Sequence, residues 1–130
     1  MIPPAPAPWT HTVTRTDIVR YQGASGDFQP IHHDEPFALA AGWPAPLGVG
    51  MFHAGVLASW ATQWLGPERV RKVRFRWKAP VFPEDTLTFT GELAESEGSL
   101  VTVKGVCTNQ RGEVTVTGWF SFQLEDSVSL

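Results

Sequence analysis

The sequence predicts an α+β fold in which a curled antiparallel sheet of about five strands wraps around one buried helix. Residues 51–65 are apolar on nearly every helical face and end at Gly66-Pro67, which is typical of a central helix buried all round. From residue 71 onward, apolar and polar residues alternate in runs separated by turn residues, which indicates strands joined by tight turns. Curling the sheet around the helix is the simplest way to bury the apolar residues of both halves.

Two short helices are expected before the central one. Thr16 is a suitable N-cap for a helix over residues 17–22 that stops at the following glycine. Asp34 is a second candidate N-cap, for a helix over residues 35–42 with proline in its first turn.

Four strands are expected in the second half, and they are predicted to form an antiparallel meander. The alternating segments are residues 71–79, 86–93, 100–107 and 114–124. A strand near Val13 is expected to add a fifth member at the edge of the sheet.

Length and composition indicate one domain of 130 residues, divided into a proline-rich arm (1–12) and a folded domain (13–130). The formal net charge of −3 argues against a general nucleic-acid surface. The single Cys107 cannot form an internal disulfide, so a cytoplasmic location is expected. No apolar run reaches the ~20 residues that a membrane span needs, so no membrane association is expected.

The segment from Gly26 to His32 carries the candidate catalytic groups, Asp27 and His32, in a stretch that cannot form an α-helix. Pro30 removes a backbone donor and pushes Gln29 out of the α region. We expect the chain to turn sharply at Gly26 and then to run extended to His32. Such a loop can aim the carboxylate and the imidazole into one pocket, where they can share the transfer of a proton.

The apolar helix is expected to begin at Gly50-Met51, facing the same substrate. A helix N-terminus presents free backbone N–H groups and the positive end of the helix dipole. These groups stabilise negative charge that develops on a substrate oxygen. Gly50 and Met51 are therefore the candidate oxyanion-binding and substrate-binding residues.

Together these motifs resemble the MaoC-like dehydratases, hot-dog-fold proteins that include the (R)-specific enoyl-CoA hydratases. The resemblance covers the chain from about Val13 to Leu124. Its most specific part is residues 25–32, which are close to the family's Gly-Asp-x-Asn-Pro-hydrophobic-His signature. The chain departs from the family pattern at Gln29, where Asn is usual, and at Val49, where many members have His.

The resemblance implies a hydratase or dehydratase that interconverts a trans-2-enoyl thioester and an (R)-3-hydroxyacyl thioester. Asp27 and His32 match the family's catalytic acid and histidine, and Gly50 matches the glycine whose amide holds the thioester carbonyl. Coenzyme A is expected only as part of an acyl-CoA substrate, with no other cofactor and no metal. An acyl-carrier-protein thioester is an equally suitable substrate. A homodimer or higher homo-oligomer is implied.

Two alternatives stay open. One is an acyl-CoA thioesterase of the same fold, which would direct water at the carbonyl carbon rather than at the alkene. The other is a non-catalytic subunit that binds an acyl thioester and needs a partner chain.

Residues around these groups have a structural and a functional interpretation. Gln29 and Pro30 are expected to support the catalytic pair from behind. Four basic residues alternate along one expected strand, where they form either a solvated face or, at Arg74 and Arg76, a site for the phosphates of CoA. The four are Lys72, Arg74, Arg76 and Lys78.

His33 is expected to lie at the surface or to support the catalytic groups from behind, and His53 is expected to be structural. His53 lies one turn into the buried helix and is interpreted as a hydrogen-bonded core residue. Residues 32–34 read His-His-Asp, but adjacent residues of an extended loop point in opposite directions, so no metal site is predicted there. Trp60 and Trp64, four residues apart, are interpreted as core residues.

Overall fold

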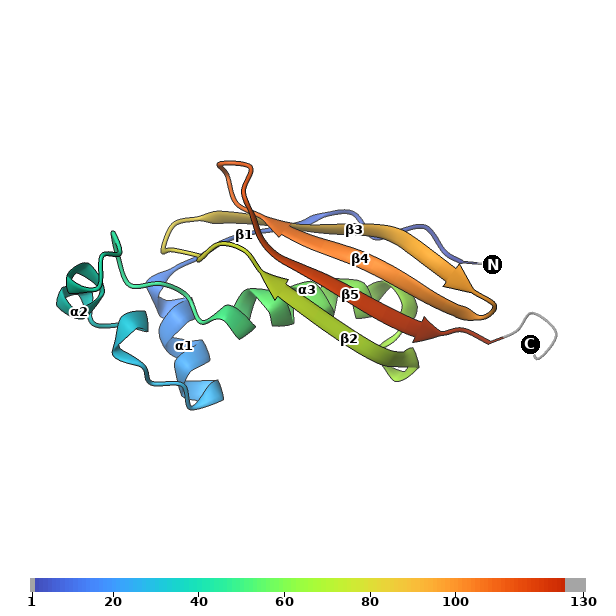
Figure 1. The fold of residues 1–130 in the computed structure, drawn as a ribbon, viewed down its shortest axis with the longest axis horizontal. Coiled ribbons are helices and arrows are strands. Elements are labelled where there is room, and N and C mark those ends of the chain that lie inside the picture. Colours follow the sequence, from blue (N-terminus) through green and yellow to red (C-terminus); the bar gives the residue numbers. More distant parts are fainter. Residues whose placement is uncertain (1, 126–130) are drawn as a thin grey trace.

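The computed structural model describes residues 2–125, and Figure 1 shows how their helices and strands are arranged. The α-helices of this range are α1 (Arg15–Ser25), α2 (Glu35–Ala40) and α3 (Gly50–Leu65). Its strands are β1 (Trp9–Thr12), β2 (Val70–Trp77), β3 (Thr86–Glu97), β4 (Leu100–Thr108) and β5 (Val114–Gln123). There are also two 3-10 turns: Pro30–His32 precedes α2, and Pro67–Arg69 follows α3.

The strands form one antiparallel sheet in the order β1-β3-β4-β5-β2. The expected meander is confirmed for β3, β4 and β5, which pair in sequence order. It is wrong for β2, which pairs with β5 at the far edge instead of with β3. The connection between β2 and β3 contains Pro80 and Pro83, which cannot form a two-residue hairpin turn, so the chain crosses to the other side of the sheet.

The expected fifth strand is present as β1, which pairs with β3 from Trp9 to Thr12. It ends at Thr12, one residue before Val13, and so lies entirely within the segment assigned to the proline-rich arm. Residues before it are also bound to the domain, because the indole of Trp60 donates to the Ala7 carbonyl and that of Trp64 to the Pro3 carbonyl.

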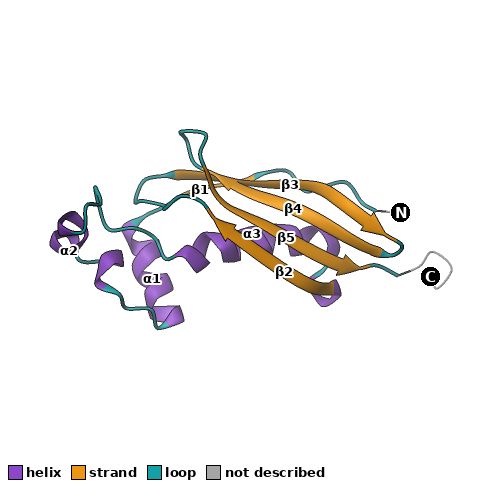
Figure 2. Cartoon of the chain, in the orientation of Figure 1, coloured by secondary structure: helices purple, strands orange, loops and turns teal. Residues whose placement is uncertain are grey.

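Figure 2 shows α3 against one face of the curled sheet, with α1 and α2 gathered beyond one end. The sheet contributes apolar residues to the core between these layers, and α3 contributes Leu57 and Trp60. Two glycines let the helix approach the strands closely. A Cβ at Gly91 would lie 2.9 Å from the Trp60 ring, and one at Gly105 would lie 3.0 Å from the Leu57 side chain. The expected hot-dog architecture is confirmed.

The helices differ from the expectations in their boundaries and in their burial, and α2 ends at Ala40, two residues earlier than expected. α1 begins after Thr14 rather than Thr16, because Thr14 and Asp17 form a reciprocal capping box, and it continues through Gly23 to Ser25. The central helix was expected to be buried on every face. Within residues 2–125 it is not, because Met51 in the first turn of α3 is 47% exposed. The N-cap at Asp34 is confirmed, with its carboxylate accepting the Phe37 N–H at 3.2 Å. Among residues 2–125, no helix is long and apolar enough to cross a membrane.

Candidate active site

The loop between α1 and α2 brings the two predicted catalytic side chains together. Gly26 ends α1 with a left-handed φ of +76°, which suits glycine. The expected extended path to His32 is wrong, because residues 30–32 form a 3-10 turn with Pro30 at its first position. A proline ring presets the φ angle for that position and has no N–H that would be left unpaired. The tight turn shortens the path between Asp27 and His32.

The imidazole of His32 faces the carboxylate of Asp27. Its Nε2 lies 3.7 Å from the Asp27 Oδ2, and the side chains are 11% and 39% exposed, respectively. The His32 Nδ1 lies 2.7 Å from the Leu47 carbonyl oxygen, which can only accept a hydrogen bond. In the neutral ring the proton is therefore on Nδ1, and the lone pair of Nε2 points toward the acid.

A separation of 3.7 Å is too long for a direct hydrogen bond. Two acceptors at this spacing leave room for a water molecule beside both, with one hydrogen donated to each. The arrangement can thus hold a water oxygen and receive its proton. This is the geometry that general-base chemistry requires.

Gln22 organises the loop from α1, a role that the sequence interpretation missed. Its buried side-chain amide donates to the Asp27 carbonyl at 3.0 Å and to the Gln29 carbonyl at 3.4 Å, and it lies 3.1 Å from the His33 Nδ1. The available signal was a polar residue four positions after Ile18, on the face of α1 that carries this apolar residue. A buried side-chain amide needs hydrogen-bond partners, so such a residue indicates a nearby loop whose backbone carbonyls it can bind.

Gln29 contacts the Asp27 carboxylate through its backbone. Its N–H donates to the Asp27 Oδ1 at 3.3 Å, which leaves Oδ2 facing His32. The longer side chain at this family position therefore does not alter the hydrogen bond to Asp27. Whether Gln29 and Pro30 influence the reaction stays a prediction.

The N-terminus of α3 follows directly on the segment that holds His32. Leu47 donates its N–H to the Ile31 carbonyl and accepts from the His32 ring, and the helix begins three residues later at Gly50. Three residues span at most about 11 Å. Neither Gly50 nor Met51 has an acceptor for its backbone N–H within residues 2–125. Both N–H groups are therefore available to an oxyanion.

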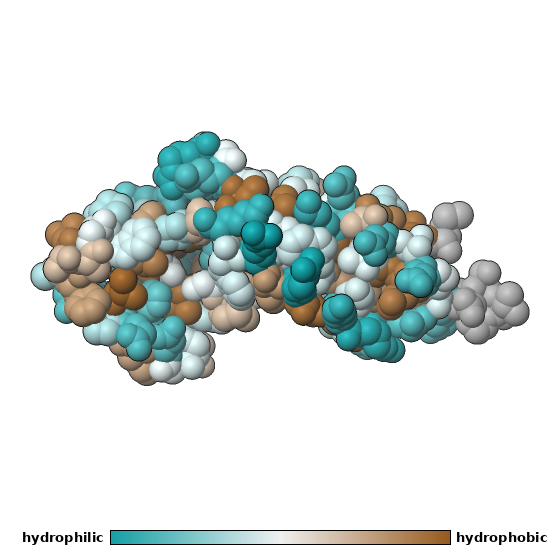
Figure 3. Space-filling model, in the orientation of Figure 1, coloured by the Kyte–Doolittle hydropathy of each residue, from teal (hydrophilic) through white to brown (hydrophobic). Residues whose placement is uncertain are grey.

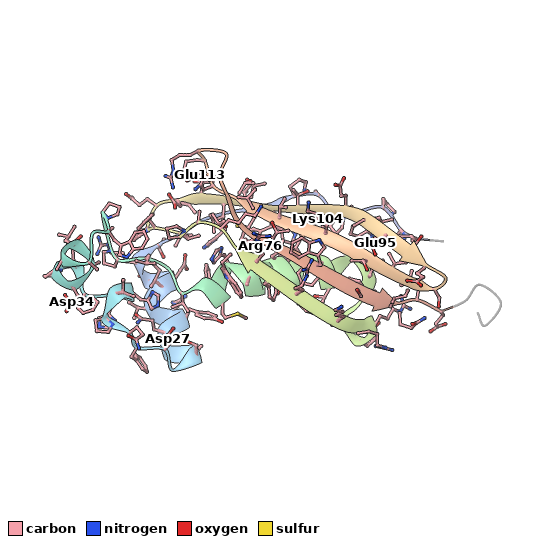
Figure 4. The ribbon with its side chains drawn as sticks, in the orientation of Figure 1. Asp27, Asp34, Arg76, Glu95, Lys104 and Glu113 are labelled. Atoms are coloured by element: carbon pink, nitrogen blue, oxygen red, sulfur yellow. The ribbon has the colours of Figure 1, made fainter. Side chains whose placement is uncertain are left out.

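The basic residues of β2 lie on the outer face of the sheet. Arg74 pairs in register with Trp119 and stacks on its ring at 4.2 Å, and Arg76 pairs with Thr117. Figure 4 places Arg76 on the sheet and Asp27 by the helices beyond its end, and Figure 3 shows hydrophilic side chains along this face. A role of Arg74 and Arg76 in binding the phosphates of CoA stays a prediction.

His53 is a core residue, as expected. It is 2% exposed, and its Nδ1 lies 3.0 Å from the Thr115 hydroxyl, which in turn lies 3.3 Å from the Cys107 carbonyl. A bulge in β5 turns Thr115 toward α3, because Val114 pairs with Thr108 while Val116 pairs with Cys107. Burial lowers the pKa of His53 to about 4, so this imidazole is neutral at pH 7.

The hollow that borders His32 is small. It has a volume of about 80 Å³ and lies between α1, His32 and the residues Pro46 and Pro83. Sites for ligands of drug size typically measure ~300–1,000 Å³. Two large apolar side chains next to predicted site residues are also exposed: Phe28, which follows Asp27, is 65% exposed, and Met51, which follows Gly50, is 47% exposed. A thioester substrate would thus be only partly enclosed by the described residues of one chain.

Comparison with known proteins gives the class. Residues 4–116 match the model of the MaoC like domain. The 3-oxo-4,17-pregnadiene-20-carboxyl-CoA hydratase beta subunit of Mycobacterium tuberculosis is 33% identical over 113 residues, which are 86% of this chain and 87% of that protein. The (R)-specific enoyl-CoA hydratase of Rhodospirillum rubrum is 30% identical over 111 residues, covering 82% and 76% of the two chains.

A solved structure agrees with these relatives. A chain in the crystal structure of the ChsH1-ChsH2 complex from Mycobacterium tuberculosis superposes with a TM-score of 0.85 at 28% identity, over 96% of this chain and 98% of that one. The protein therefore belongs to the MaoC-like family of hydratases and dehydratases.

Proposed function

We propose that the protein adds water across the double bond of a trans-2-enoyl thioester, or removes it in the reverse direction, to give an (R)-3-hydroxyacyl thioester. One observation carries the proposal. The Nε2 of His32 lies 3.7 Å from the Asp27 Oδ2, while the Leu47 carbonyl holds the proton on Nδ1. Two adjacent acceptors can hold a water molecule, and one of them can take its proton.

In the proposed reaction, a water molecule donates to Asp27 and His32 and attacks C3 of the enoyl group as one acceptor takes its proton. Electron density moves to the thioester oxygen, which the Gly50 and Met51 N–H groups stabilise. The protonated member of the pair then delivers a proton to C2. No net oxidation occurs, and the proton that leaves the water is the one that C2 receives.

The carrier is proposed to be coenzyme A. Both curated relatives are named as hydratases of CoA thioesters, which supports this choice over a carrier-protein thioester. Hydration assays on matched acyl chains carried by CoA and by acyl-carrier protein test it.

A second candidate is a hydratase that is active only with a partner chain. A relative is named a beta subunit, and the superposed structure is a complex of two proteins. The small hollow beside His32 and the exposed Phe28 and Met51 also favour a covering chain. A homodimer or higher homo-oligomer stays a prediction, and either kind of second chain would supply the missing wall.

Crotonyl-CoA distinguishes these functions. Hydration lowers the absorbance of the conjugated enoyl thioester without releasing a thiol, whereas a thioesterase releases free CoA. Activity in the purified protein supports the first candidate. Inactivity that is reversed by adding a second hot-dog chain supports the second, and thiol release from the purified protein contradicts both.

A further inference from the structure

The indole of Trp77 is bonded to the first peptide of α3. Trp77 is the last residue of β2, and its Nε1 donates to the Gly50 carbonyl at 2.9 Å. The ring lies directly against the glycine, since a Cβ at residue 50 would be 3.1 Å from Nε1 and 3.4 Å from Cδ1. Glycine at position 50 therefore allows this strand residue to reach the start of the helix.

Neither burial nor hydrogen-bond satisfaction accounts for this contact. The Trp77 side chain is 46% exposed, so it is not a core anchor. The Gly50 carbonyl is the acceptor that the helical register assigns to the Ala54 N–H, so it does not need the indole as a partner. The indole supplies a second donor to a carbonyl that already has one.

The consequence lies at the other end of the same peptide group. The Gly50 carbonyl and the Met51 N–H belong to one planar unit. A donor on the carbonyl fixes the plane of this unit and polarises it, which makes the N–H a stronger donor. The Met51 N–H has no acceptor within residues 2–125.

We propose that Trp77 is a positioning residue for the oxyanion-binding groups: its indole N–H orients and polarises the Gly50–Met51 peptide, so that the Met51 N–H acts with the Gly50 N–H on the thioester oxygen. The inference rests on the proposed hydration. It adds a residue from the edge strand β2 to a site otherwise built from the α1–α2 loop and α3. Sequence periodicity hides this role, because Trp77 continues the apolar row of Val73 and Phe75.

Trp77→Phe tests the proposal, because it keeps an aromatic ring and removes the donor. Polarisation contributes about 10–30% per bond, and losing a whole oxyanion donor costs about 100- to 1,000-fold, so a roughly two- to eightfold fall in kcat is expected. The KM for crotonyl-CoA should change little, since the donor acts on charge that develops in the transition state. The carbonyl ¹³C resonance of Gly50 should move upfield as its hydrogen bond is lost.

Trp64→Phe is the matched control. It removes an indole N–H from the last turn of the same helix, where Trp64 donates to the Pro3 carbonyl at 2.8 Å. This variant should leave kcat and the Gly50 resonance unchanged. An equal fall in kcat in both variants would reveal general destabilisation and overturn the proposal.

Two further outcomes distinguish the role of Trp77 from the proposed hydration. If the unsubstituted protein hydrates crotonyl-CoA and Trp77→Phe has the same kcat, the role of Trp77 is refuted while the proposed hydration stands. If the unsubstituted protein, with or without a second hot-dog chain, hydrates no enoyl thioester, both are refuted.

Discussion

Helix α1 has an aspartate–histidine pair at each end, and the closer pair is the one without catalytic geometry. At its start, the His11 Nε2 lies 2.7 Å from the Asp17 Oδ2. Just beyond its end, the corresponding atoms of His32 and Asp27 are 3.7 Å apart. A search for the shortest contact between acid and imidazole would select the first pair.

The surrounding bonds explain why the first pair is structural. The Asp17 carboxylate also accepts the Thr14 N–H at 2.9 Å, and the Thr14 hydroxyl accepts the Asp17 N–H at 3.0 Å. Burial alone would raise the pKa of Asp17, but hydrogen bonds from Thr14 and His11 outweigh it and hold the pKa below its ordinary value. The single carboxylate oxygen Oδ2 is thus already used by two donors. This pair stabilises the start of a helix.

Pocket size would also select the wrong pair. A hollow of about 400 Å³, lined largely by Trp9, Phe52, Val56 and Phe89, borders His11 and Asp17, whereas the one beside His32 measures about 80 Å³. The pair at the end of α1 is distinguished by unused acceptors, a lone pair on the His32 Nε2 and the Asp27 Oδ2. These unused acceptors, rather than proximity or pocket volume, are the reason for proposing Asp27 and His32 as the catalytic pair.

The largest expected effect is on the turnover of the proposed reaction. Asp27→Asn and His32→Ala should each lower kcat for crotonyl-CoA by roughly 100- to 10,000-fold, because each removes a proton-transferring group. Asp17→Asn and His11→Ala are matched controls and should leave kcat within a factor of two or so. A loss at the first pair as large as at the second would reverse the assignment.

His53 extends the comparison to an imidazole without an acid partner. Its pKa is lowered to about 4 by burial, against about 6.5 in the unfolded chain. Between these values the unfolded state binds a proton that the folded state does not, so stability is lost as the pH falls through this range. The loss attributable to His53 should approach ~3 kcal/mol near pH 4.

Urea unfolding from pH 8 to pH 4 measures this loss. His53→Gln keeps a donor for the Thr115 hydroxyl and removes the titration, so its unfolding free energy should fall less steeply with decreasing pH. Parallel curves for the two proteins would contradict the assignment.

Gln22→Leu tests whether Gln22 holds the loop that carries Asp27 and His32. The substitution keeps a buried side chain but leaves the Asp27 and Gln29 carbonyls without their donor, which should cost about 1–3 kcal/mol in unfolding free energy. The kcat for hydration should also fall, because the hydrogen bonds from Gln22 to these two carbonyls fix the loop that carries Asp27. Gln63→Leu makes the same change at an exposed position of α3 and should shift stability by no more than about 0.5 kcal/mol.

The smallest effect concerns the closer pair. Asp17→Ala removes one half of the capping box and should lower the unfolding free energy by about 1 kcal/mol, with kcat unchanged. Because the folded pKa of Asp17 is lowered, the stabilisation exists above its unfolded pKa and is lost as the pH falls through the folded value. The unfolding free energies of the two proteins should therefore converge in acid, as chemical denaturation at stepped pH can measure.

The sequence alone determined the strands and the central helix, and it pointed to the two side chains that are proposed to react. These features depend on local rules: period-two alternation in the strands, the N-cap at Asp34, and an acid and an imidazole fixed on either side of Pro30. They also determined the family resemblance, which the match of residues 4–116 confirms.

Only the tertiary structure decided which groups surround the proposed catalytic pair. The Leu47 carbonyl that sets the tautomer of His32 is 15 residues away from it in the sequence, and Trp77 is 27 residues from Gly50. The Gln22 amide that holds the loop is five residues from Asp27. The position of β2 beside β5 was equally hidden. The contacts of Leu47 and Trp77 follow from packing between elements, whose free energy depends on the whole core and leaves no period or spacing in the chain.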